Sequence, residues 1–306
     1  MRNWRYLVYA LAVIVFMTLP FYTGVYLLNV AGYILIFMTL TLTWDMLLRS
    51  GQISFGIYGF FGVGAYTAVI TFLDAGIHPL FSILLGGIFA GLLALVIGLF
   101  VLQLRELYFA IVTLALGGIF MVVARNIPEL TGGPEGRVLP STIFDGDPTM
   151  TYWLILAVAV LTVIISILFQ KSRVHFAITS IRDDEIVARS SGINVFSYLV
   201  FLFAVTSAIQ GLAGGVYGHI YGFASPEGSF DLNFVLLPMA MALLGGIYTT
   251  WGPVLGAMLL GSISEFLKLL IPYGHLLVYG IIIIVVILFF PRGIVGTLGK
   301  HFYKRK

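Results

Sequence analysis

Long tracts without a single charged residue constrain this chain more than any other feature. They cover residues 6–44, 50–73, 75–104, 107–124, 148–170, 190–226, 232–264 and 269–291. A bilayer core about 30 Å thick needs about 20 apolar residues in a helix, so most tracts hold one span and the longest hold two. Only 9% of the residues are charged and 60% are hydrophobic, against about 25% charged in soluble domains. The chain is therefore expected to be an all-α polytopic membrane helical bundle, in a single transmembrane domain over residues 1–306.

Dividing the tracts at charges, Gly and Pro predicts about ten transmembrane or re-entrant segments. They are expected near 6–28, 30–48, 53–73, 79–103, 107–125, 151–170, 198–221, 232–249, 253–271 and 275–291. Eight full spans with two re-entrant segments fit the pattern equally well. Helix-breaking residues gather in 53–66 and 238–252, at comparable positions in two halves, which is typical of an inverted repeat around a central pathway. Close helix packing through small residues is the alternative explanation.

The distribution of basic residues predicts the orientation. With a cytoplasmic N-terminus, every Lys and Arg except Arg125, Arg137 and Lys268 falls on the inside, as the positive-inside rule requires. We therefore expect both termini in the cytoplasm, an external loop near 126–150 and a cytoplasmic loop near 171–197. The first apolar run lacks a cleavage site of small residues, so it is interpreted as a retained helix rather than a signal peptide.

Several classes of function lack the residues they need. The net charge of +3 is small and scattered, which argues against nucleic-acid binding. The chain has no Cys, no P-loop motif and no HExxH motif, and its five His are dispersed, so we expect no catalytic residues and no metal site. Asp45 with Arg49 and Glu265 with Lys268 are spaced to pair near span ends, and few ionisable groups remain to couple an ion gradient. Such a pathway is passive or is driven by another protein.

The loop at 171–197 encodes a short helix. Ser180 or Asp183 is expected to cap it, Glu185 can pair with Arg189 at i,i+4, and Gly192 supplies a left-handed stop. Its apolar side, formed by Ile178, Ile181 and Ala188, requires burial. Its charged side would suit a partner protein, although packing against its own bundle is also possible.

Nine blocks in a fixed order resemble the LivM-type permeases of branched-chain amino acid ABC importers. They are 51–56 (GQISFG), 62–67 (GVGAYT), 108–115 (YFAIVTLA), 129–136 (ELTGGPEG), 181–192 (IRDDEIVARSSG), 203–215 (FAVTSAIQGLAGG), 243–246 (LLGG), 252–257 (GPVLGA) and 291–294 (PRGI). The resemblance extends over nearly the whole chain, and it is the combination of blocks that is specific.

The resemblance implies an importer in a bacterial or archaeal plasma (inner) membrane. Its expected partners are a second, LivH-like permease, two cytoplasmic ATP-binding subunits and an extracytoplasmic solute-binding protein. ATP and Mg²⁺ would bind the ATPases, so this chain is expected to hold no cofactor and to perform no catalysis. The coupling helix that docks on an ATPase would contain Ile181, Arg182, Asp183, Asp184, Glu185, Ala188, Arg189 and Gly192.

The solute pathway and the cargo are less defined. Candidate pathway residues are the aromatic and helix-breaking residues Phe55, Tyr58, Phe61, Tyr66, Gly117, Gly118, Pro238, Gly245 and Gly246. Many relatives are expected to carry a polar residue where this chain has Gly117 and Gly118, so the cargo can differ from leucine, and urea or a short amide stays an alternative. A self-sufficient facilitator or channel is the alternative of a different class. The external loop is expected either to dock the binding protein or to serve as a simple connection.

Overall fold

A computed structural model describes residues 13–104 and 106–270, together with positions 280, 281, 284 and 293. Within this part of the chain, eight segments are long and apolar enough to cross a membrane. They contain α2 (Val25–Leu48), α3 (Ile57–Ala75), α4 (Pro79–Val101), α5 (Glu106–Asn126), α7 (Pro148–Lys171), α10 (Val195–Tyr221), α12 (Asn233–Gly245) preceded by the short α11 (Pro226–Ser229), and α13 (Trp251–Leu270). The expected all-α membrane bundle is confirmed.

The first expected span, 6–28, is wrong as a single helix. The described helix after residue 12 gives way to a 3-10 turn, η1 (Leu19–Phe21), and α2 begins only after Gly24. Pro20 accounts for the break, since proline lacks the N–H that an interior helical residue donates. The start of this expected span and nearly all of 275–291 lie outside the described residues, and an inverted repeat stays a prediction.

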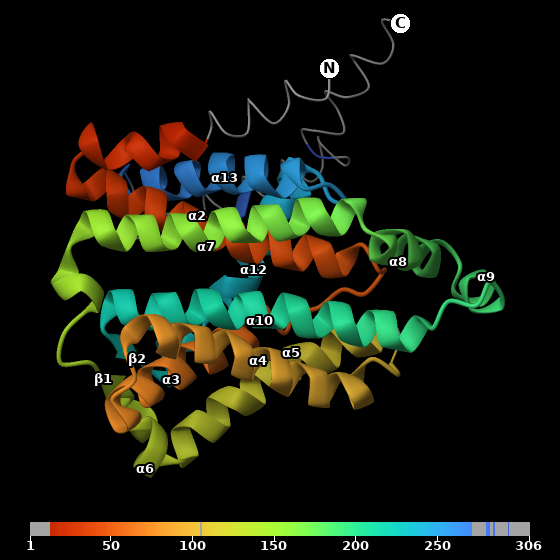
Figure 1. The fold of residues 1–306 in the computed structure, drawn as a ribbon, viewed down its shortest axis with the longest axis horizontal. Helices are drawn as coiled ribbons and strands as arrows, with labels where there is room; N and C mark the ends of the chain where they lie inside the picture. Colours follow the sequence, from red (N-terminus) through yellow and green to blue (C-terminus); the bar gives the residue numbers. More distant parts are fainter. Residues whose placement is uncertain (1–12, 105, 271–279, 282–283, 285–292, 294–306) are drawn as a thin grey trace, which may run out of the picture.

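The helices form two packed groups that meet where α10 packs against α2 and through α12 (Figure 1). In one group α10 packs along α3 and α4, and α5 lies against α3. In the other, α2 packs against α7 and α13. Helix α12 contacts α2, α3 and α13, so it lies between the groups.

Small residues let the helices of the first group approach closely. A Cβ on Gly64 would lie 2.0 Å from the carbonyl oxygen of Gly211, and one on Gly214 would lie 1.9 Å from that of Phe61. These distances leave no room for a side chain, so backbone packs on backbone as in small-xxx-small interfaces. Segment 57–66 is therefore part of a continuous packed helix, whereas 51–56 is irregular.

The two ends of the bundle differ. The end that we name the α8–α9 end carries α8 (Arg173–Asp183) and α9 (Glu185–Ser190). The opposite end carries α6 (Pro128–Thr131), η2 (Gly133–Glu135), β1 (Arg137–Val138), η3 (Ile143–Gly146) and β2 (Phe223–Ala224). Strands β1 and β2 pair antiparallel, with Arg137 opposite Ala224, and we name this the β1–β2 end. Ion pairs between Arg125 and Glu227 and between Arg137 and Asp74 tie its loops to the helices.

Candidate functional site

Two short helices project from the bundle between α7 and α10 (Figure 1). Ser172 caps α8, accepting a hydrogen bond from the backbone N–H of His175 at 3.4 Å. Asp184 adopts an extended backbone and its side chain accepts from the N–H groups of Ile186 at 2.9 Å and Val187 at 3.1 Å. An aspartate in this position satisfies N–H groups that the first helical turn leaves unpaired. The loop therefore bends at Asp184 and restarts as α9.

The sequence-based assignment of the cap was wrong. Ser180 and Asp183 lie inside α8, and Asp184 performs the role expected of them. The other local features are confirmed: Gly192 has φ of +83°, and the Arg189 guanidinium lies 2.7 Å from the Glu185 carboxylate.

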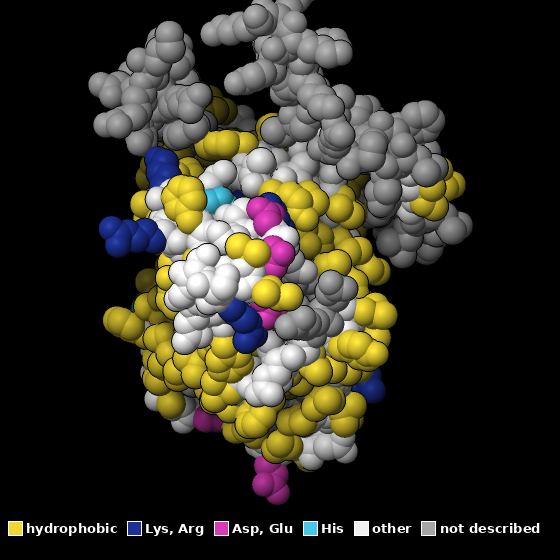
Figure 2. All heavy atoms as spheres, turned by 90° about the vertical axis from the view of Figure 1, so that its right-hand side faces the viewer, with side chains coloured by type: hydrophobic (Ala, Val, Ile, Leu, Met, Phe, Trp, Pro, Cys, Tyr) yellow, Lys and Arg dark blue, Asp and Glu magenta, His cyan; other side chains and the backbone are white. Residues whose placement is uncertain are grey.

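One face of the α8–α9 segment is buried, whereas α9 carries two exposed apolar side chains and α8 carries a third, Phe176. Ile178, Ile181 and Ala188 pack into the apolar core at this end, as expected. By contrast, Ile186 is 78% exposed and Val187 is 58% exposed. Figure 2 shows this end face-on, with charged and apolar side chains intermixed at its centre and apolar side chains around it. We name the exposed pair Ile186 and Val187 the α9 tip. Neither residue is among the coupling residues inferred from the sequence, although Asp184 and Glu185 mark where the tip begins.

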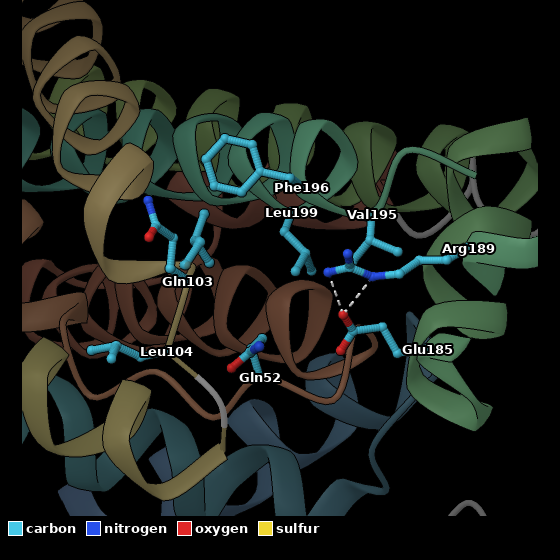
Figure 3. A pocket seen from close by; sticks show the side chains of 9 residues that line it. Gln52, Gln103, Leu104, Glu185, Arg189, Val195, Phe196 and Leu199 are labelled. Carbon is cyan, nitrogen blue, oxygen red and sulfur yellow. Dashed lines mark hydrogen bonds and ion pairs between the residues drawn. The ribbon is translucent and has the colours of Figure 1, made fainter. Parts of the chain in front are cut away.

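A cavity of about 190 Å³ adjoins α9. Its walls come from segment 102–104, the start of α10, Gln52, and the paired side chains of Glu185 and Arg189 (Figure 3). Within the described part of the chain, the side-chain oxygen of Gln52 is buried without a hydrogen-bond partner. The cavity offers polar and apolar groups together beside the α9 tip, which suits a protein side chain better than lipid.

A chain of contacts runs from α8 into the bundle. The Arg182 guanidinium lies over the Tyr248 ring, 4.5 Å from its centroid. Tyr248 belongs to the turn between α12 and α13 and has φ of +66°. Its backbone N–H donates to the carboxylate of Asp45 at 2.6 Å. Asp45 in turn pairs with Arg49 at 2.7 Å, and both side chains have 0% exposure.

The expected pairing of Asp45 with Arg49 is confirmed, and its complete burial was not expected. Arg49 also donates to the Ser166 hydroxyl at 3.5 Å. Ser166 hydrogen-bonds to Thr250 at 2.9 Å, and Thr250 donates to Gln170 at 3.0 Å. Because a buried charge is costly unless it is paired and hydrogen-bonded, this network holds α2, α7 and the α12–α13 turn in one arrangement.

His175 lies where α7 meets α8. Burial lowers the pKa of its imidazole from the ordinary value of 6.5, and the nearby charges of Arg49 and Arg182 lower this pKa further. Its ring packs edge-on against Phe169, with centroids 5.6 Å apart. His175 is therefore neutral at pH 7 and lies near the two arginines of the contact chain, Arg49 and Arg182.

The candidate pathway residues are packed in this conformation. The Tyr58 hydroxyl donates to the Leu114 carbonyl at 2.6 Å, and a Cβ on Gly117 would lie 2.2 Å from the Tyr58 ring. Three other residues are buried: Phe61, Tyr66 and Pro238. Phe55 is half-buried and Gly118 has an open approach, whereas Gly245 and Gly246 form the end of α12. A role in lining the pathway stays a prediction for this set.

In the described residues, no cluster of three or more His, Asp or Glu is arranged to hold a metal ion. The notable ionised groups form pairs instead, as described above. These features define a multi-pass helical membrane protein with a projecting segment that bears an exposed apolar tip. The arrangement offers an exposed apolar contact surface at the α8–α9 end and a chain of contacts from that end into the bundle.

Comparison with known proteins identifies the family. Residues 26–287 match the family described as "Branched-chain amino acid transport system / permease component", and the chain belongs to this family. The LivM permease protein of the high-affinity branched-chain amino acid transport system of Escherichia coli K12 is 27% identical over 304 residues, which covers 90% of this chain and 71% of LivM.

Two further relatives are more distant. The LivH permease protein of the same E. coli system is 26% identical over 193 residues, covering 57% of this chain and 60% of LivH. A solved structure, PsaBC from Streptococcus pneumoniae in complex with Fab, superposes with a TM-score of 0.50 at 15% identity, over 87% of this chain and 92% of that chain. At this identity the superposition indicates a shared fold and nothing more specific.

Proposed function

We propose that this chain is a transmembrane permease subunit of an ATP-driven importer for branched-chain or related amino acids. It provides the solute path, and partner ATPases, which bind ATP and Mg²⁺, supply the energy. The family membership supports the class of protein, and the relatives named LivM and LivH support the cargo and the pairing with a second permease. The chain lies in the plasma membrane with the α8–α9 end in the cytoplasm, and a solute-binding protein docks on the β1–β2 end.

The α9 tip carries the proposal, because it is an exposed apolar pair flanked by the charged side chains of Asp184, Glu185 and Arg189. An apolar contact ringed by charge is typical of the core and rim of a protein interface. We infer that a groove on the ATPase receives Ile186 and Val187, while Asp184 and the Glu185–Arg189 pair lie at its rim. The coupling residues inferred from the sequence lie between Ile181 and Gly192 and then have three roles. Some are buried against the bundle, the charged ones lie at the rim of the interface, and Gly192 ends α9.

Movement of α8–α9 is passed to the bundle through Arg182 and Tyr248. The Tyr248 turn joins α12 to α13, and its backbone is held by the buried Asp45. A displaced α8 therefore pulls on the turn that links α12 to α13. A facilitator or channel that works without an ATPase has no use for this connection, and this disfavours the alternative function.

Labelling of single cysteines tests the orientation and the docking, since the chain contains no Cys. Val187→Cys is placed on the α9 tip, and Ser141→Cys, exposed in the loop before η3, is the matched control. A membrane-impermeant maleimide is expected to label Val187→Cys only in inside-out vesicles, and bound ATPase is expected to protect it. Ser141→Cys should react only in right-side-out vesicles. Labelling of Val187→Cys from the outside, or no protection by the ATPase, would contradict the proposal.

A further inference from the structure

A second pocket lies far from the α8–α9 end. It has a volume of about 190 Å³ and opens between α2, α10, α12 and α13 near the β1–β2 end. A neighbouring pocket of about 310 Å³ shares Tyr33 and Tyr221 with it. We name the first pocket the vestibule. Its volume equals the liquid volume of roughly six water molecules, which suits a small solute.

Opposite charges line the vestibule from different elements. Asp231 precedes α12, and its carboxylate is oriented by the backbone N–H of Asn233 at 2.8 Å and by the Asn233 side-chain amide at 3.2 Å. Lys268 on α13 places its ammonium 4.2 Å from the centroid of the Tyr33 ring. The same ammonium pairs with Glu265. Both charged groups are thus held in position before any solute arrives.

Aromatic rings form much of the remaining wall of the vestibule. Phe37 and Phe234 form part of its wall and stack with centroids 5.7 Å apart. Behind them the Phe234 ring lies 4.1 Å from the ring of Phe61, which is fully buried. Phe61 is one of the candidate pathway residues, so a wall residue of the vestibule contacts one residue of the route inferred from the sequence.

We propose that the vestibule binds the zwitterionic backbone of a small apolar amino acid. Lys268 receives the α-carboxylate and Asp231 the α-ammonium, while the solute's side chain lies against Phe37 and Phe234. A lysine ammonium has three donors, so Lys268 can serve a carboxylate while it remains paired with Glu265. Charge-assisted hydrogen bonds of this kind are the strong ones, and a mostly apolar pocket with a few placed polar groups is typical of small-molecule sites.

This inference deepens the proposed function by assigning the cargo class to particular residues. A neutral solute such as urea or a nucleoside can hydrogen-bond to these two groups but forms no ion pair with either, so the two opposite charges favour a zwitterion. The aromatic wall excludes a strongly polar side chain, because such a side chain would lose its hydration there without a partner. Leucine and its close relatives satisfy both requirements.

Calorimetry on the purified full-length chain in detergent tests the assignment. Two leucine analogues serve as probes, and each lacks one of leucine's two charged groups. Leucinamide keeps the ammonium and lacks the carboxylate, whereas 4-methylpentanoate keeps the carboxylate and lacks the ammonium. L-Leucine is expected to bind at least tenfold more tightly than either. Lys268→Met should weaken leucine roughly 10- to 100-fold, the usual effect of losing a hydrogen bond to a charged group, and should leave leucinamide unchanged.

Asp231→Asn should show the reverse selectivity, weakening leucine while leaving 4-methylpentanoate unchanged. Lys268→Arg keeps the charge and should retain leucine binding, which guards against a folding defect in Lys268→Met. Glu129→Gln, exposed on α6 at the same end, is the control that should change nothing.

Three results would overturn the assignment: no leucine binding to the unaltered chain, equal weakening of leucine and leucinamide by Lys268→Met, or displacement of leucine by adenosine or urea. None of these results bears on labelling at the α9 tip. The cargo site and the ATPase docking can therefore fail independently.

Discussion

The guanidinium of Arg182 lies over the ring of Tyr248, 4.5 Å from its centroid, and joins a helix outside the bundle to the turn between α12 and α13. A cation over an aromatic face contributes about 0.5–2 kcal/mol, depending on exposure. A contact of this strength can form and break without a large cost in free energy.

Removing this ring should uncouple ATP hydrolysis from transport. Tyr248→Ala removes the cation–π contact, whereas Tyr248→Phe preserves it, and both keep the backbone N–H that Asp45 accepts. In the reconstituted complex we expect Tyr248→Ala to lower the solute transported per ATP several-fold, in line with about 0.5–2 kcal/mol. Tyr248→Phe should behave like the unaltered chain. Equal effects of the two substitutions would show that the ring's cation contact is not used.

The buried pair of Asp45 and Arg49 should respond differently to single and double substitution. Asp45→Asn leaves the Arg49 charge buried without its anion, which costs about 3–5 kcal/mol. Asp45→Leu combined with Arg49→Met removes both charges, so it should recover much of this loss. Chemical unfolding of the purified chain in detergent measures both. A double variant less stable than Asp45→Asn would mean that the pair itself stabilises the fold.

Substitutions at two glycines distinguish a role in helix packing from a role in lining the pathway. A Cβ on Gly64 would lie 2.0 Å from the Gly211 carbonyl oxygen, whereas one on Gly118 would meet only the Tyr58 hydroxyl at 3.9 Å. Gly64→Ala should therefore destabilise the protein by about 1–3 kcal/mol, as overpacking does. Gly118→Ala should be neutral for stability or slightly stabilising, because alanine favours a helix more than glycine. Thermal unfolding tests this, and the expected ranking fails if Gly64→Ala is tolerated as well as Gly118→Ala.

His175 should make the protein less stable in acid. The pKa of its imidazole is lower in the folded chain than its ordinary value of 6.5, so the folded state binds this proton more weakly than the unfolded state. Stability from this group is present above pH 6.5 and is lost as the pH falls through the folded pKa. His175→Gln should therefore lose less stability than the unaltered chain between pH 7.5 and pH 5. Parallel losses in the two proteins would exclude His175 as the cause.

Local features of the fold were predictable because each depends on neighbours in sequence. Charge-free tracts locate the membrane helices, the i,i+4 spacing pairs Glu185 with Arg189, and Gly192 ends α9. The cap was misplaced by one residue for Asp183 and by four for Ser180, because Ser180, Asp183 and Asp184 all have suitable side chains. The backbone bends at Asp184, and this bend makes Asp184 the residue that caps α9.

Long-range features were not predictable in the same way. Asp45 accepts its backbone hydrogen bond from Tyr248, which is 203 positions away, so the sequence pattern around Asp45 predicts a pair at a helix end rather than a fully buried network. The vestibule likewise brings Asp231 and Lys268 together with Tyr33 from three separate elements. The exposure of Ile186 and Val187 depends on how α8 packs against the bundle. Helix α9 has only 6 residues, too few for a hydrophobic periodicity to show which of its faces is exposed.

In the proposed function, this chain conducts solute without energy of its own and receives movement through the α9 tip. ATP-dependent uptake of labelled leucine into proteoliposomes tests it most directly. We compare the chain alone, the complete complex, and the complex carrying Ile186→Asp with Val187→Asp. Accumulation is expected only in the complete unaltered complex with ATP. Accumulation by the chain alone, or undiminished uptake with the substituted tip, would contradict the account.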